Sequence, residues 1–184
     1  VVNGNTSTAV DIKIVAVGQE IPATYAGDKA KNTPGFSWYV SEHYALKSSM
    51  DEAFSREMLE VSELAHPHWL AVAGGEPPDP RKRMYVVYAR NNEQLRQAMI
   101  SDIGTAPGGF QGGFTLWTPG SYNLPGGTLR YHLRGLVIHE NLHQIHMLVN
   151  NTGGTEDLAY SGEQHVYDPQ KKQLTVFVYD HAPI

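Results

Sequence analysis

The stretch from residue 128 to about residue 150 is the longest helix that the sequence predicts, and it constrains the fold most. Apolar residues occur on nearly every side of this helix: Leu136, Val137, Ile138, Leu142 and Ile145. A helix that is apolar nearly all round needs other elements packed over it. The sequence therefore predicts a buried helix, and a group of titratable side chains lies in the middle of it.

Shorter elements are expected on both sides of this helix. We predict strands over residues 10–17, 37–46, 84–89, 114–117 and 174–179, and helices that begin at Ser49 and near Asn91. Residues 18–36 and 119–127 are expected to be loops, and Pro67 is expected to end or kink the first helix. Strands and helices are mixed without regular βαβ alternation, so the predicted class is α+β.

The length of 184 residues fits a single domain. Residues 1–36 are expected to form a strand and a loop-rich segment. Residues 128–168 are expected to carry two helices, the long one and a short one after the break near residues 150–154, with a twisted mixed sheet nearby.

Composition excludes several classes of function. The chain has no Cys, which removes thiolate nucleophiles and cysteine metal sites. Its net charge of −5, with no basic cluster, argues against nucleic acid as a partner. No apolar run reaches 18 residues, so no membrane span is expected. The sparse charge favours an exported bacterial protein, secreted, periplasmic or at the cell surface.

The polar group within the long helix is His139-Glu140-Asn141-Leu142-His143, which matches H-E-x-x-H. Residues four apart share one helix face, so both imidazoles can reach one zinc ion. Glu140 is rotated by about 100° from His139, so it stands beside the metal and can take a proton from water. The spacing predicts a zinc site with Glu140 as general base.

A catalytic zinc site usually has a third protein ligand. Glu163 follows His143 by 20 positions and Glu156 follows it by 13. If a helix returns antiparallel after the break, its rise brings Glu163 nearly level with His143. We therefore favour Glu163 as the third ligand, with Glu156 as the alternative.

These residues resemble the gluzincin metallopeptidases, the thermolysin-like clan, in which the third ligand follows at a similar distance. The order of strands and helices is also similar to the peptidase-MA-like group. The resemblance implies a zincin-like fold, an edge strand at residues 114–117 that pairs with an extended peptide, and a following ligand helix. Residues 155–160 (TEDLAY) are similar to that group's third-ligand motif, which would favour Glu156.

The same resemblance implies two supporting roles. An acidic residue after the third ligand would orient a ligand histidine, and Asp157 and Asp168 are the candidates. A Tyr or His at the mouth of the site would stabilise the oxyanion, and Tyr160, Tyr167 and His165 are available.

We expect a zinc-dependent peptidase acting on a peptide or protein substrate. The alternatives are a non-catalytic metallopeptidase-like binding module and a zinc amidase that acts on a non-protein amide. The oligomeric state stays open.

Overall fold

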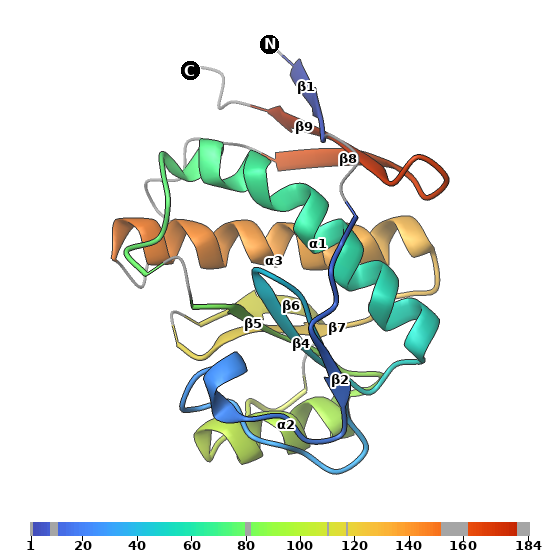
Figure 1. Ribbon diagram of the computed structural model, residues 1–184. Coiled ribbons are helices and arrows are strands. Elements are labelled where there is room, and N and C mark those ends of the chain that lie inside the picture. Colours follow the sequence, from blue (N-terminus) through green and yellow to red (C-terminus); the bar gives the residue numbers. More distant parts are fainter. Residues whose placement is uncertain are drawn as a thin grey trace.

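The computed structural model describes residues 2–7, 11–79, 82–109, 111–116, 118–151 and 162–179. These residues form four layers (Figure 1): a small sheet, the helix pair α1 and α3, a large sheet, and α2. The helices are α1 (Glu52–Ala73), α2 (Asn92–Ile103), α3 (Arg130–Asn150) and the 3-10 turn η1 (Ala23–Tyr25). The strands are β1 (Val2–Thr6), β2 (Ala16–Gly18), β3 (Ser37–Val40), β4 (Tyr44–Ser48), β5 (Met84–Tyr88), β6 (Gly112–Thr115), β7 (Gly120–Leu124), β8 (Gly162–Asp168) and β9 (Gln173–Tyr179). The predicted α+β class is confirmed.

The large sheet is mixed, with strand order β2-β3-β4-β5-β7-β6. Its central strands β4, β5 and β7 are parallel, whereas β2, β3 and β6 pair antiparallel with their neighbours. All five residues of β5 are buried, as the apolar run in the sequence predicted, because helices cover both faces of the sheet. The strand β6 lies at one edge of this sheet and contacts α3.

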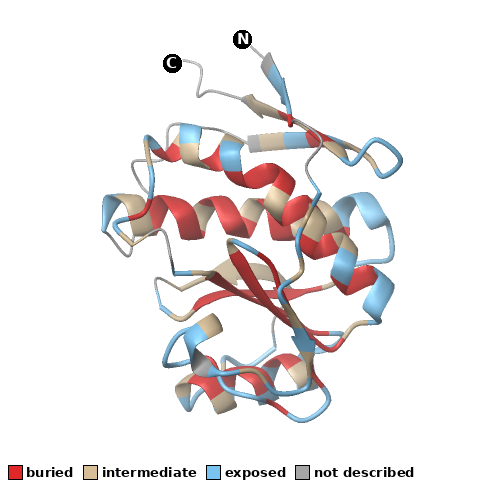
Figure 2. Ribbon diagram, in the orientation of Figure 1, coloured by how far each residue is buried: buried red, intermediate tan, exposed pale blue. Residues whose placement is uncertain are grey.

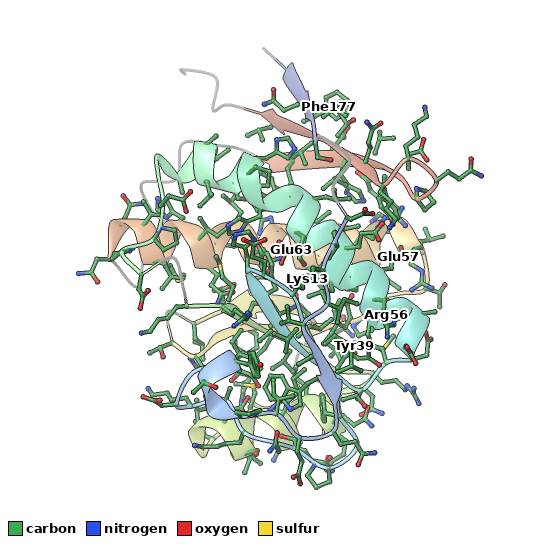
Figure 3. All side chains as sticks on the ribbon, viewed as in Figure 1. Lys13, Tyr39, Arg56, Glu57, Glu63 and Phe177 are labelled. Carbon is green, nitrogen blue, oxygen red and sulfur yellow. The ribbon has the colours of Figure 1, made fainter. Side chains whose placement is uncertain are left out.

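The small sheet has the order β1-β9-β8 and is antiparallel throughout. Leu174 and Val176 point from β9 into the core shared with α1 and α3. Phe177 (labelled in Figure 3) lies against Gly4 of β1. A Cβ atom added at Gly4 would lie 2.5 Å from the Phe177 ring. This sheet therefore joins a strand near the start of the chain to two strands after α3.

The N-cap of α1 lies two residues after the predicted cap at Ser49. The Asp51 carboxylate accepts the backbone N–H of Phe54 at 2.8 Å and caps the helix. The prediction that Pro67 ends the helix was wrong, because α1 continues to Ala73. The indole N–H of Trp69 donates to the Ile138 carbonyl of α3 at 2.9 Å and anchors this last part of α1.

Two strand predictions and one loop prediction need correction. Residues 37–46 form no single strand, because the chain turns between β3 and β4. Within the predicted strand 10–17, the observed strand β2 begins only at Ala16. The predicted loop 119–127 contains β7, a fully buried strand, and β1 was not predicted. The sequence of β7, GSYNL, lacks an apolar run, and the NH2 group of Asn123 donates to the Val87 carbonyl inside the sheet at 3.1 Å.

The long helix is confirmed as α3, buried between the two sheets along most of its length (Figure 2). Residues 128–168 were expected to carry two metal-site helices. This expectation is wrong for residues 162–168, which form the strand β8. Glu163 lies on the strand β8, not on a returning helix. Residues 152–161, where the short ligand helix was expected to begin, lie outside the described residues.

Candidate metal centre

The two histidines of the motif face each other on α3. The Nε2 atoms of His139 and His143 lie 2.8 Å apart, and their rings are nearly perpendicular. Two protonated nitrogens cannot occupy this geometry, so one ring donates to the other or both lone pairs face a cation. Burial, together with the neighbouring His139, lowers the pKa of His143 to about 4, so its imidazole is neutral at pH 7. Neutral imidazole is the form that binds metal.

Glu163 reaches this pair from β8. Its Oε1 atom lies 2.8 Å from Nδ1 of His139, and this hydrogen bond raises the pKa of His139. The other oxygen, Oε2, is buried without a hydrogen-bond partner, and so is Nδ1 of His143. Orphaned buried polar atoms are costly in a folded protein. Here both belong to the residues that the sequence singled out.

Glu140 reaches the edge strand β6 with its side chain. Its side chain is buried, and burial raises the pKa of its carboxyl group. Thr115 of β6 donates its hydroxyl to Oε2 of Glu140 at 2.6 Å. A carboxylate with a raised pKa beside a histidine pair is suited to general-base chemistry.

Space for the Glu140 side chain depends on Gly113, two residues before Thr115 on β6. A Cβ atom at Gly113 would lie 2.7 Å from Cγ and 2.8 Å from Oε1 of Glu140. The predicted edge strand, residues 114–117, overlaps β6 only at Phe114 and Thr115. Both contacts with Glu140 were missed, because they join residues far apart in the sequence that no local pattern relates.

Two candidates for oxyanion stabilisation, His165 and Tyr167, lie on β8 together with Glu163. Tyr167 lies four residues after Glu163 on the same face of β8, and its hydroxyl donates to Glu60 of α1 at 2.5 Å. His165 is buried between these two positions, stacks on Tyr131, and has a pKa lowered to about 4 by burial and by Arg134. The structure does not bring Tyr167 to the histidine pair.

The remaining candidates divide into two groups. Asp168 accepts the backbone N–H groups of Gln170 and Lys171 and so closes the turn between β8 and β9, away from His139 and His143. Other predicted residues lie outside the described residues: Glu156, Asp157, Tyr160 and Trp117.

The donor set fits zinc in its chemistry. Among the described residues, no group of three His, Cys, Asp or Glu side chains is arranged as a ready-made metal site. A tetrahedral zinc ion holds two ligand atoms roughly 3.3 Å apart. The two Nε2 atoms are therefore about half an ångström too close, which small rotations of the two rings would correct. Two imidazoles with a carboxylate beside them are the ligand types that zinc prefers.

Known proteins give no further indication of the class. No protein family, curated protein or solved structure matches this chain. None of the helices in the described part of the chain is long and apolar enough to cross a membrane. Any assignment of function therefore rests on the geometry around α3.

Proposed function

We propose that this chain is a zinc-dependent peptidase with a zincin-like arrangement of its site. The observation that carries the proposal is the pair of imidazoles on α3, with Nε2 atoms 2.8 Å apart, next to the buried carboxylate of Glu140. A buried carboxylate and two facing histidines on one helix cost folding free energy unless hydrogen bonds, opposite charges or a metal compensate them. Hydrolysis of a peptide bond uses all three groups.

In this proposal His139 and His143 would hold the metal through their imidazole nitrogens. Glu163 accepts the Nδ1 proton of His139 and thereby leaves the Nε2 lone pair free for the ion. Because one carboxylate cannot bind Nδ1 of His139 and also reach a metal on Nε2 of the same ring, Glu163 would be the third ligand only after giving up this hydrogen bond. If it keeps the hydrogen bond, Glu163 orients His139 and Glu156, the alternative, would be the third ligand. A bound zinc ion would polarise the substrate carbonyl and lower the pKa of water.

Glu140 supplies the proton transfers. Its carboxylate takes a proton from the attacking water and passes it to the leaving amine. The raised pKa brings the carboxyl group closer to the pH at which it must act, which favours both steps. The edge strand β6, beside Glu140, supports an extended peptide as substrate, because an open strand edge pairs with a backbone of any sequence.

The test combines metal content with proteolysis. The protein is purified without added zinc, its metals are measured, and cleavage of fluorescently labelled casein is followed for wild type and Glu140→Gln. We expect about one zinc per chain in both proteins and cleavage by wild type alone, since Gln cannot accept the proton. Glu93→Gln, an exposed change on α2, serves as control and should cleave like wild type.

The alternatives give different results. Absence of both zinc and cleavage would overturn the proposal in favour of a metallopeptidase-like binding module. Zinc with hydrolysis of peptidoglycan but not of casein would replace the peptide substrate by a non-protein amide. Unchanged cleavage by Glu140→Gln would exclude the mechanism itself.

A further inference from the structure

The edge strand β6 contacts the general base of the proposed reaction directly. The hydroxyl of Thr115 lies 2.6 Å from Oε2 of Glu140 and 3.1 Å from the Glu140 backbone carbonyl. A carboxylate accepts the hydroxyl proton more strongly than a carbonyl does, so Thr115 donates to Oε2. One oxygen of the base is thereby held, and Oε1 is left for the proton of water.

Gly113 completes this contact from the same face of β6. Residues two apart on a strand point to the same side, so positions 113 and 115 both face α3. A side chain at position 113 would collide with Cγ of Glu140 and with Leu136, both 2.7 Å from an added Cβ atom. The missing side chain therefore sets where the carboxylate lies, and the Thr115 hydroxyl sets how it is turned.

The backbone of the same two residues faces the open edge of the sheet. Leu116 donates its N–H to the Gly120 carbonyl of β7 at 3.0 Å, and pairs in an antiparallel ladder alternate between bonded and non-bonded. Thr115 and Gly113 are then non-bonded positions, whose N–H and C=O groups point away from β7. These two residues thus contact the base on one side of β6 and direct their backbone groups away from β7, toward the edge of the sheet.

We infer that β6 positions the general base: Thr115 orients the Glu140 carboxylate through its hydroxyl, and Gly113 leaves the space that this orientation needs. The inference rests on the proposed function. Thr115 acts through Glu140 and touches neither metal nor scissile bond, so it is a positioning residue. Its loss should therefore slow the chemical step without weakening metal or substrate binding.

The first experiment compares Thr115→Val and Thr115→Ser, with a quenched fluorescent peptide from casein as substrate. For Thr115→Val, which keeps the shape but loses the donor, we expect kcat to fall about 10- to 100-fold because the base is misplaced. KM, zinc content and melting temperature should stay near wild type. Thr115→Ser keeps the donor and should restore most of kcat. Thr175→Val, which removes a strand hydroxyl bonded to Thr6 in the other sheet, should leave kcat unchanged.

A second variant tests the space around the base. Gly113→Ala should push the Glu140 carboxylate aside and lower kcat about 100-fold, with zinc retained. Gly126→Ala, where an added Cβ meets no atom within 4 Å, is the matched control.

Several results would overturn the inference. Wild-type kcat in Thr115→Val, or an equal loss in Thr115→Ser, would show that the hydroxyl does not orient the base. Loss of zinc or a lower melting temperature along with kcat would assign Thr115 a purely structural role. If Glu140→Gln is inactive while Thr115→Val is fully active, the inference alone fails, whereas full activity of Glu140→Gln removes the proposed function itself.

Discussion

Glu163 accepts a hydrogen bond from Nδ1 of His139 at 2.8 Å, although the two residues lie on a strand of the small sheet and a helix beneath it. The contact fixes which nitrogen of His139 carries the proton. Nε2, the nitrogen that faces His143, then keeps its lone pair. The orientation of the histidine pair thus depends on an element far from the motif in sequence.

The first prediction concerns zinc affinity and the two candidate acids. Glu163→Ala removes the acceptor for His139 Nδ1 and the free oxygen Oε2, so we expect zinc affinity to fall by 10- to 100-fold or more. Competition with a chromogenic chelator measures this loss. Glu156→Ala serves as the comparison. If its loss is the larger one, Glu156 is the third ligand and Glu163 only orients His139.

The second prediction concerns the pH dependence of stability at the β3–β4 turn. Glu63 of α1 (labelled in Figure 3) accepts from the backbone and from Nδ1 of His43, at 2.8 and 2.7 Å, and from the Ser41 hydroxyl. The hydrogen bond to Glu63 raises the pKa of His43 from 6.5. Burial opposes ionisation of Glu63, but its hydrogen bonds outweigh burial and lower its pKa from 4.5.

The sign of each contribution follows from these directions. Stability from His43 is fully present below pH 6.5 and is lost as the pH rises through its higher folded pKa. Stability from Glu63 is present above pH 4.5 and is lost as the pH falls through its lower folded pKa. The ion pair therefore contributes most between these two pH values.

We expect His43→Asn to lower the free energy of unfolding by about 1 kcal/mol at pH 5.5, a value reduced for the partial exposure of His43. The difference should shrink by pH 9, where His43 is neutral. Urea titrations at both pH values measure it, and His132→Asn, on the exposed side of α3, should show no such change. A pH-independent difference would contradict the ion pair.

The third prediction concerns a fully buried ion pair beneath the large sheet. Nζ of Lys47 lies 2.8 Å from Oδ1 of Asp102, and both side chains are inaccessible to solvent. Asp102 also accepts the hydroxyls of Tyr85 and Tyr122. Lys47→Met leaves this carboxylate without its cation, so we expect the free energy of unfolding to fall by about 3–5 kcal/mol.

The double variant Lys47→Met with Asp102→Asn tests this explanation. It removes both charges and keeps an oxygen acceptor for the tyrosines, so it should recover part of the lost stability in a urea titration. If the double variant is no more stable than Lys47→Met, an uncompensated charge is not the cause.

The fourth prediction concerns the contact between β5 and β7. A Cβ atom at Gly120 would lie 2.0 Å from the backbone oxygen of Tyr85, which cannot move without breaking the sheet. We expect Gly120→Ala to destabilise the protein by about 3 kcal/mol or more, or to prevent folding. Thermal melting measures the change, with Gly126→Ala as the tolerated control. An unchanged melting temperature would mean that the two strands can separate without cost.

The sequence predicts those parts of the fold whose local patterns are strong. The helix α3, the buried strand β5 and the Asn91 cap of α2, which accepts the Gln94 N–H at 3.0 Å, all follow from short-range rules. The strands β7 and β8 do not, because polar residues occupy them, and the hydrogen bonds of Asn123 and Glu163 join them to distant parts of the chain. Local periodicity carries no information on such contacts.

The same division holds for the candidate site. The H-E-x-x-H spacing places His139 and His143 on one face because a helix repeats locally. The contact of Thr115 with Glu140 joins residues 25 positions apart, and that of Glu163 with His139 joins residues 24 apart. Glu163 was selected by counting along an expected helix, and the structure brings it to His139 from a strand instead. Contacts of this kind depend on how the layers stack.

The strand order β1-β9-β8 gives the opening residues of the chain an indirect part in the proposed chemistry. β1 hydrogen-bonds to β9, and β9 to β8, which carries Glu163. Trimming β1 would expose one side of β9 and loosen the hairpin that aims this carboxylate at His139. In this proposal, a chain shortened by six residues would keep both histidines and bind zinc more weakly.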